Sequence, residues 1–446
     1  MNYTPHTQQE INEMLKVIGM KSLDELFNHL PQKLFDMADI KLEKGMSEMD
    51  VSKYLNNLAK KNSSFSDKPG FLGGGVYDHY VPPAVDALAN RAEFYTAYTP
   101  YQPEASQGAL QAIIEYQTAI ARLTKMDIAN ASLYDGSSSL AEAILMAMEV
   151  TGKDEVIISE TTHPEWIEVV KAYLAGRDVT IHLVKASDGE SDFKAIKSLV
   201  SAETACVCIQ SPNFYGVVED YRELKSSLSE SKALLVVGCY PLSLGYLEPP
   251  GSFGADIVVG DGQSLGNYMA FGGPHFGFLA CGQEYVRKIP GRIVGQTEDS
   301  LSQRGYCLTF QTREQHIRRE KATSNICSNH ALMALRSVIY LSLLGEAGLH
   351  EAARLSYHKA HYLYKKVIEL PAFEPVFDKP FFNEFVVRSK VPALAVNQAL
   401  FNEGFIGGLA LNTVGDYDEN LIMFAVTEKR GKDELDGFIR VLKKFN

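Results

Sequence analysis

Two segments of the chain carry residue types suited to a phosphorylated, ring-shaped ligand. The serines of YDGSSSLAEA (134–143), Ser137, Ser138 and Ser139, open a predicted helix. Free backbone N–H groups and hydroxyls at a helix start favour a phosphate. His163 stands between a predicted strand and a helix, where an imidazole can stack on a flat ring. The alternatives are that these serines only cap the helix and that His163 only packs at a helix start.

A third polar segment, QTREQHIRREKATSNIC (311–327), is rich in cations. It places Arg313, Arg318, Arg319 and Lys321 next to Thr323, Ser324 and Asn325. Such a run suits an acidic partner or ligand, and it equally suits a solvated basic face. By contrast, GDGQSLG (260–266) is a weak dinucleotide motif, because the spacing of GxGxxG is missing.

The elements that must position these residues alternate between strand and helix. The predicted strands are EVIIS (155–159), VTIHLV (179–184), TACVCIQ (204–210), ALLVVGCY (233–240), ADIVVG (255–260) and FGFLAC (276–281). Segments with helical periodicity separate them, so the sequence predicts a largely parallel sheet with helices on both faces. Ligands of such sheets gather at the carboxyl ends of the strands, where the polar segments lie.

The chain divides into three predicted parts. Residues 1–69 form a helical N-terminal arm, which is too small to bury a core alone. Residues 70–330 form a large α/β domain, and residues 331–446 a small C-terminal α+β domain with the order βαββα.

Composition narrows the function classes. The 446 residues are 46% hydrophobic and 22% charged, which is typical of a globular protein, and the net charge of −12 disfavours nucleic acid and anionic membranes as partners. The N-terminus has no signal-peptide pattern, and the apolar segment ALMALRSVIYLSLLG contains Arg336. The six cysteines have no CxxC spacing, so we expect reduced thiols, no metal and a cytoplasmic location.

Long motifs resemble those of a known family. They are YTPYQPEASQGALQAIIEYQ (98–117), YDGSSSLAEA, SPNFYGVVED (211–220), AFGGPHFG (270–277) and REKATSNICSN (319–329). In this order they resemble the pyridoxal-phosphate (PLP) enzymes of fold type I, and within them the P-protein (glycine decarboxylase) family of the glycine cleavage system. The resemblance spans nearly the whole chain and matches subunit 1, the N-terminal half, of the two-subunit bacterial form.

The resemblance implies a reaction and partners. The family decarboxylates glycine with PLP and passes the aminomethyl group to the lipoyl arm of H-protein. The two-subunit form implies a partner, subunit 2, in an α2β2-type heterotetramer.

The cofactor residues of the family are missing from this chain. The PLP lysine is expected at Gln263 or Ser264, and no lysine occurs from Ala233 to Arg287. A carboxylate for the pyridine nitrogen is expected where Gly238 and Cys239 stand. Without the lysine PLP has no covalent attachment, so we expect no catalytic residue here and only a vestigial site at Ser137, Ser138, Ser139 and His163.

We therefore expect PLP on the partner subunit, with this chain lending residues across the interface. The candidates are Thr99, Pro100, Tyr101, Gln102, Arg319, Lys321, Thr323 and Asn325. Two alternatives stay open: a self-sufficient PLP aminotransferase or lyase with its lysine elsewhere, and a scaffold or regulatory pseudoenzyme that never touches substrate.

Overall fold

The computed structural model describes residues 5–38 and 41–446, which divide into two units, Met1–Ser63 and Ser64–Asn446. Helices α1 (Gln8–Val17), α2 (Gln32–Met37) and α3 (Glu48–Ala59) lie in the first unit. Among its described residues only Leu15 is buried, so the first unit has no core of its own. The division falls six residues before the boundary of the predicted arm.

A seven-stranded sheet forms the centre of residues 64–446, in the order β1-β9-β8-β7-β6-β2-β3. Its strands are β1 (Ile128–Ala129), β2 (Glu155–Ser159), β3 (Thr180–Val184), β6 (Thr204–Gln210), β7 (Leu234–Gly238), β8 (Ile257–Asp261) and β9 (Gly277–Cys281). The pairings from β8 through to β3 are parallel. The central strands are buried on both faces, as their continuous apolar runs predict.

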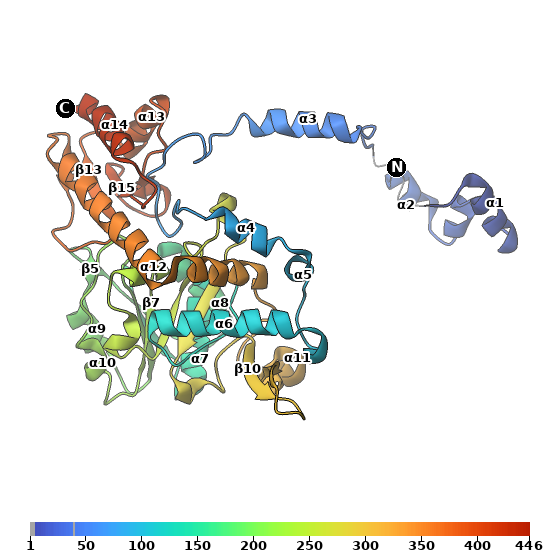
Figure 1. Cartoon of the computed structure of the whole chain (residues 1–446), viewed down its shortest axis with the longest axis horizontal. Helices are drawn as coiled ribbons and strands as arrows, with labels where there is room; N and C mark the ends of the chain where they lie inside the picture. Colours follow the sequence, from blue (N-terminus) through green and yellow to red (C-terminus); the bar gives the residue numbers. More distant parts are fainter. Residues whose placement is uncertain (1–4, 39–40) are drawn as a thin grey trace. The chain divides into compact units, whose positions relative to one another are not determined.

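Helices cover both faces of this sheet (Figure 1). On one face α6 (Gln107–Thr124) and the long α12 (Ala331–Ile368) pack beside each other. On the other face α7 (Gly136–Thr151) packs against α8 (Pro164–Leu174). The period of two along β6 sends Val207 to the first core, and Cys206 and Cys208 to the second.

Helix α12 is long and apolar enough to cross a membrane by length and composition alone. Its Arg336, however, donates to Asp86 of α4 (Pro83–Ala89) at 2.7 Å and to the carbonyl of Gly266 at 3.2 Å. The helix also changes direction at Gly345, whose φ of 60° lies in the left-handed region. These contacts make α12 a packed helix that links the large sheet to the C-terminal domain.

The C-terminal domain is an open antiparallel sheet with the order β12-β13-β15-β14. Its elements are β12 (Phe373–Pro375), β13 (Glu384–Ser389), α13 (Ala393–Asn402), β14 (Leu409–Ala410), β15 (Leu421–Ala425) and α14 (Lys432–Leu442). From β13 onward this is the predicted order βαββα. A separate apolar core lies between its sheet and the helices.

Three features of the strands differ from a purely parallel sheet whose strands alternate with helices. Strand β9 runs antiparallel to both neighbours, β8 and β1. A hairpin of β10 (Ile293–Glu298) and β11 (Arg304–Thr309) precedes the cationic segment, and the sequence analysis missed it. Short strands β4 (Ala186–Ser187) and β5 (Glu190–Ser191) also form a hairpin after β3.

Candidate functional site

The carboxyl ends of the parallel strands surround a small cavity. Its volume is about 30 Å³, and its lining is Gly75, Tyr77, His163, Trp166, Gln210, Pro212, Cys239, Tyr240, Asp261, Asn383 and Glu384. A single water needs roughly 10–15 Å³ on this measure. The cavity therefore has room for about two waters but not for a phosphorylated ring, and no lysine is among the described residues that line it.

Two carboxylates accept hydrogen bonds from the backbone N–H groups at the start of α7. Asp135 accepts the backbone N–H of Ser138 at 2.7 Å, and Asp261 accepts that of Gly136 at 3.2 Å. The hydroxyls of Ser138 and Ser139 donate to the carbonyl oxygen of Asp135, at 3.1 and 2.7 Å. A phosphate here would meet two carboxylates and few free donors, so these contacts oppose phosphate binding.

His163 is bonded within the chain on both ring nitrogens. Its Nδ1 accepts the backbone N–H of Glu165 at 3.2 Å, so His163 caps α8, and Nε2 lies 3.0 Å from the carbonyl oxygen of Gly74. Burial lowers the pKa of His163, and the imidazole stays neutral with the proton on Nε2. The ring stacks on Trp166, with 6.1 Å between the ring centres.

Trp166 fills the space between the start of α7 and the end of β7. A Cβ atom at Gly136 would lie 2.2 Å from the indole, and one at Gly238 would lie 3.3 Å from it. Glycine is therefore required at position 136 because the indole leaves no room. No carboxylate stands at Gly238 or Cys239, the place expected for a partner of a pyridine nitrogen.

Gln263 occupies the place expected for a lysine, and it is buried. Its amide accepts the N–H of Tyr77 at 3.0 Å and donates to the carbonyl oxygens of Tyr77 at 3.0 Å and Asn267 at 2.9 Å. Ser264 beside it is also buried. The sequence analysis missed Asp261, a half-buried carboxylate at the end of β8. Loss of solvation raises the pKa of Asp261, and the nearby His275 opposes that rise.

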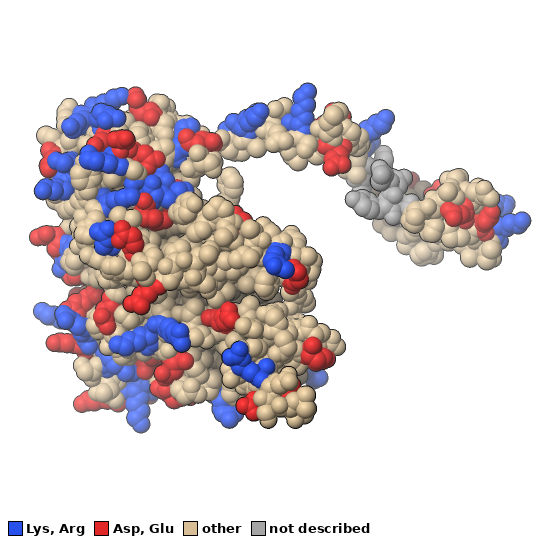
Figure 2. All heavy atoms as spheres, in the orientation of Figure 1, with Lys and Arg blue, Asp and Glu red and all other residues tan. Residues whose placement is uncertain are grey.

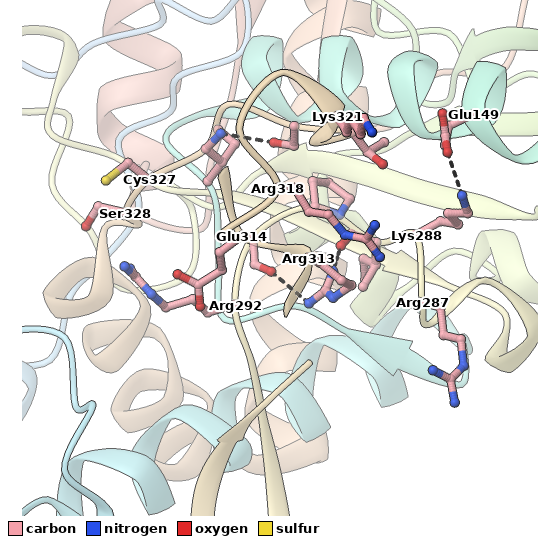
Figure 3. Close-up of a pocket in the computed structure, with 16 residues that line it drawn as sticks. Glu149, Arg287, Lys288, Arg292, Arg313, Glu314, Arg318, Lys321, Cys327 and Ser328 are labelled. Atoms are coloured by element: carbon pink, nitrogen blue, oxygen red, sulfur yellow. Dashed lines mark hydrogen bonds and ion pairs between the residues drawn. The ribbon is translucent and has the colours of Figure 1, made fainter. Parts of the chain in front are cut away.

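A second, cationic cavity of about 150 Å³ lies beside the 311–327 segment (Figure 3). Its lining is Glu149, Arg287, Lys288, Ile289, Pro290, Gly291, Arg292, Arg313, Glu314, Arg318, Lys321, Thr323, Ser324, Ile326, Cys327 and Ser328. Arg318 belongs to the one-turn helix α11 (Gln315–Arg318), and Arg292 directly precedes β10.

An apolar cavity of about 340 Å³ adjoins it. Thr99 and Pro100 line it together with residues of α5 (Ala92–Tyr95), α6 and the start of α12. Figure 2 shows few charged side chains on the face that α4, α6 and α12 form. Tyr95 and Tyr98, exposed by 64% and 85%, add aromatic surface here.

Arg292 joins the two cavities, because it lines both. Its guanidinium donates to the hydroxyl of Tyr101 at 3.0 Å, and that hydroxyl lies 3.5 Å from Glu314. The structure therefore brings together two segments that are more than 200 residues apart in the chain. Arg292 was missed, since it stands alone in an ordinary sequence context, and Glu314 was passed over among the cations of the 311–327 segment.

Some of the predicted interface residues line these cavities and others do not. Thr99 and Pro100 line the apolar cavity, while Lys321 and Thr323 line the cationic one. Tyr101 bonds Arg292 at the boundary. Gln102, Arg319 and Asn325 are exposed and line neither cavity. No cluster of metal-ligating side chains occurs among the residues that the structure describes.

Comparisons with known proteins give consistent matches. The family model "Glycine cleavage system P-protein" matches residues 1–442. The chain is 48% identical to the probable glycine dehydrogenase (decarboxylating) subunit 1 of Carboxydothermus hydrogenoformans, over 99% of both chains. It is 49% identical to the subunit 1 of Listeria monocytogenes serotype 4b, over 99% of this chain and 98% of the relative.

Solved structures agree with this similarity. The crystal structure of a glycine decarboxylase (P-protein) of the glycine cleavage system, in inhibitor-bound form, matches with a TM-score of 0.91 and 46% identity over 100% of both chains. A glutamate decarboxylase of Lactobacillus brevis shares only the fold, with a TM-score of 0.68 and 14% identity over 95% of this chain and 96% of the other. The predicted fold class, α/β of PLP fold type I, is confirmed.

Proposed function

Because the chain belongs to the P-protein family of the glycine cleavage system, we propose that it is subunit 1 of a two-subunit glycine dehydrogenase (decarboxylating). In this proposal subunit 2 binds PLP, and the assembled α2β2-type heterotetramer decarboxylates glycine and passes the aminomethyl group to lipoylated H-protein. The complex is cytoplasmic. This chain supplies structure and interface residues instead of the covalent chemistry.

The observation that best supports placing PLP on the partner subunit is that Gln263 stands at the position expected for the lysine. The residues around the first cavity do not fit PLP, because an amide replaces the amine and the volume is about 30 Å³. At the start of α7, Asp135 and Asp261 already accept the backbone donors that a phosphate would use. PLP supplies an electron sink for decarboxylation when bound, and we place that role on the partner.

The segments at the two larger cavities are the surfaces that this chain offers to the partner. The Arg292 guanidinium orients the Tyr101 hydroxyl through a hydrogen bond, and the ring lies under the same cation. Thr99 and Pro100 line the apolar cavity, and Lys321 and Thr323 add polar groups to the cationic cavity that adjoins it. Apolar area bordered by polar groups is typical of subunit interfaces.

The experiment is a decarboxylation assay with glycine, PLP and lipoylated H-protein. It is run on this chain alone, on the lysine-bearing partner alone and on the mixture, and borohydride reduction followed by peptide mapping locates the cofactor. We expect turnover only in the mixture and the reduced cofactor at one partner lysine. Turnover by this chain alone, with the cofactor on one of its lysines, would instead support the self-sufficient PLP enzyme.

Point variants at the two segments distinguish the scaffold alternative from the proposal that this chain lends residues to the partner's site. Variants that lower turnover while the complex still assembles favour lent residues. Variants that change only assembly favour a scaffold.

A further inference from the structure

The cationic cavity holds far more positive than negative charge. Its cations are Arg287, Lys288, Arg292, Arg313, Arg318 and Lys321. Within the described part of the chain, only Lys288 among them forms an ion pair, with Glu149 at 2.5 Å. Arg354, an exposed arginine outside the cavity, has a carboxylate partner in Glu351. A chain with a net charge of −12 thus leaves five cations unpaired around one cavity.

Arg313 lies in the centre of this cluster (Figure 3). Its guanidinium donates to the carbonyl oxygens of Ile289 and Gly291, which fix its position. Its Nε is buried without a hydrogen-bond partner, as is the Nε of Arg292. Burial lowers the pKa of Arg313, because partial removal of the guanidinium from water disfavours its charged form.

Other side chains at the cavity are suited to the same ligand. Lys321 makes no hydrogen bond or ion pair with any described residue, so its ammonium is free to bind. Thr323 and Ser324 add hydroxyl groups to the lining. Cations combined with hydroxyls in a cavity of about 150 Å³ provide charge and hydrogen bonds for an oxyanion with more than one negative charge.

We propose that this cavity is a binding site for a phosphate group, held mainly by Arg313 with Lys321 at the rim. Binding would supply the missing counter-charge to the half-buried guanidinium groups of Arg292 and Arg313. All of its lining residues belong to this chain and Ser137 is not among them, so the proposal goes beyond the function proposed above and phosphate binding can be measured on the isolated chain. The shared chemistry is a phosphate dianion, either free or as the ester of a larger molecule.

The test is isothermal titration calorimetry of inorganic phosphate into the full chain at low ionic strength. We expect saturable binding of one phosphate per chain. Arg313→Met weakens it at least about tenfold, since charge-assisted hydrogen bonds are each worth roughly 1.5–3 kcal/mol. Arg354→Met, which removes an exposed and paired arginine far along the chain, is the matched control and leaves the affinity unchanged.

Arg313 also holds two backbone carbonyls, so its variant is checked by circular dichroism and thermal melting. Lys321→Met is the second variant, because Lys321 has no structural contact to lose, and we expect a several-fold weaker affinity. Absence of saturable binding by the wild-type chain overturns the proposal. Equal affinities of the wild type and Lys321→Met, together with a folded Arg313→Met that binds normally, overturn it as well.

A competition arm distinguishes the two sources of phosphate. Pyridoxine 5′-phosphate carries the ester but no aldehyde, so it forms no covalent bond with lysines. Displacement of inorganic phosphate by it supports a site that accepts phosphate esters. Retention of phosphate supports a site restricted to the free ion. Both measurements use the isolated chain, so their outcome is independent of glycine turnover by the complex.

Discussion

The side-chain amide of Gln263 bonds both backbone polar groups of Tyr77, accepting its N–H and donating to its carbonyl oxygen, each at 3.0 Å. The two residues are 186 positions apart. This pair closes the loop after β8 onto the segment that leads toward Thr99. A residue at the place expected for a catalytic lysine therefore holds backbone in position.

Gln263→Leu should destabilise the large domain without changing its fold. The substitution keeps the volume but leaves buried backbone groups of Tyr77 and Asn267 without partners, which costs about 2–4 kcal/mol. Urea unfolding of the full chain measures the change. Gln398→Leu on the exposed face of α13 is the control, because Gln398 bonds only Asn402 nearby. A loss below about 0.5 kcal/mol at Gln263 would contradict a structural role.

Thr323→Ala should lower glycine turnover by the mixed complex several-fold while the chains still assemble. Thr323 lines the cationic cavity, and the proposal places this segment next to the partner's site. Steady-state assays with size-exclusion chromatography measure both quantities. Thr180→Ala, on exposed edge strand β3, is the matched control. Unchanged turnover by Thr323→Ala and Arg319→Ala would remove the 319–325 segment from the site.

Glu384 should make the chain less stable as the pH rises from about 4.5 to 7. Burial raises the pKa of Glu384 from 4.5 to about 7, against the hydrogen bond from Tyr77. The folded state then holds a proton that the unfolded state has released, so stability is lost with rising pH in this window. The shift corresponds to at most about 3 kcal/mol.

Glu384→Gln removes this titration. Glu142, whose pKa burial also raises to about 7, contributes a slope of the same sign, so the informative quantity is the difference between variant and wild type. We expect that difference to shift in favour of the variant between pH 4.5 and 7 and then to stay level. Free energies of unfolding across this range measure it, and a constant difference would contradict the raised pKa.

Removal of residues 1–63 should leave the remaining chain folded with nearly the same melting temperature. The first unit buries only Leu15 among its described residues, and α3 exposes Tyr54, Leu55 and Leu58. Association with the partner subunit should weaken, because exposed apolar helix faces are typical of interaction surfaces. Thermal melts and analytical ultracentrifugation of the 64–446 chain with the partner test both parts. Loss of more than a few degrees would show that the first unit stabilises the rest.

Much of the fold could be predicted because its strands are continuous apolar runs. Those of β6 and β7 are buried on both faces and need no partner to be recognised. The direction of β9 and the hairpin of β10 with β11 depend on pairing between distant residues, which periodicity does not encode. The boundaries 1–69, 70–330 and 331–446 stay predictions, and α12 begins at Ala331, the first residue of the last of these regions.

The site was predictable only where polar residues cluster in the sequence. Lys321 and Thr323 stand in a visibly cationic segment and do line a cavity. Arg292 stands alone, and its importance arises only when folding places it between Tyr101 and the 311–327 segment. Likewise, nothing in the local sequence indicates that Trp166 occupies the space at Gly136, because that contact joins two helices.

Trp166 is also the single tryptophan of the chain. Its indole packs against the start of α7 and against His163, at the carboxyl ends of the parallel strands. The tryptophan fluorescence of the protein therefore originates at one point. Emission excited at the red edge of the absorption band reports on the packing of this one layer, without contributions from the N-terminal helices or the C-terminal sheet.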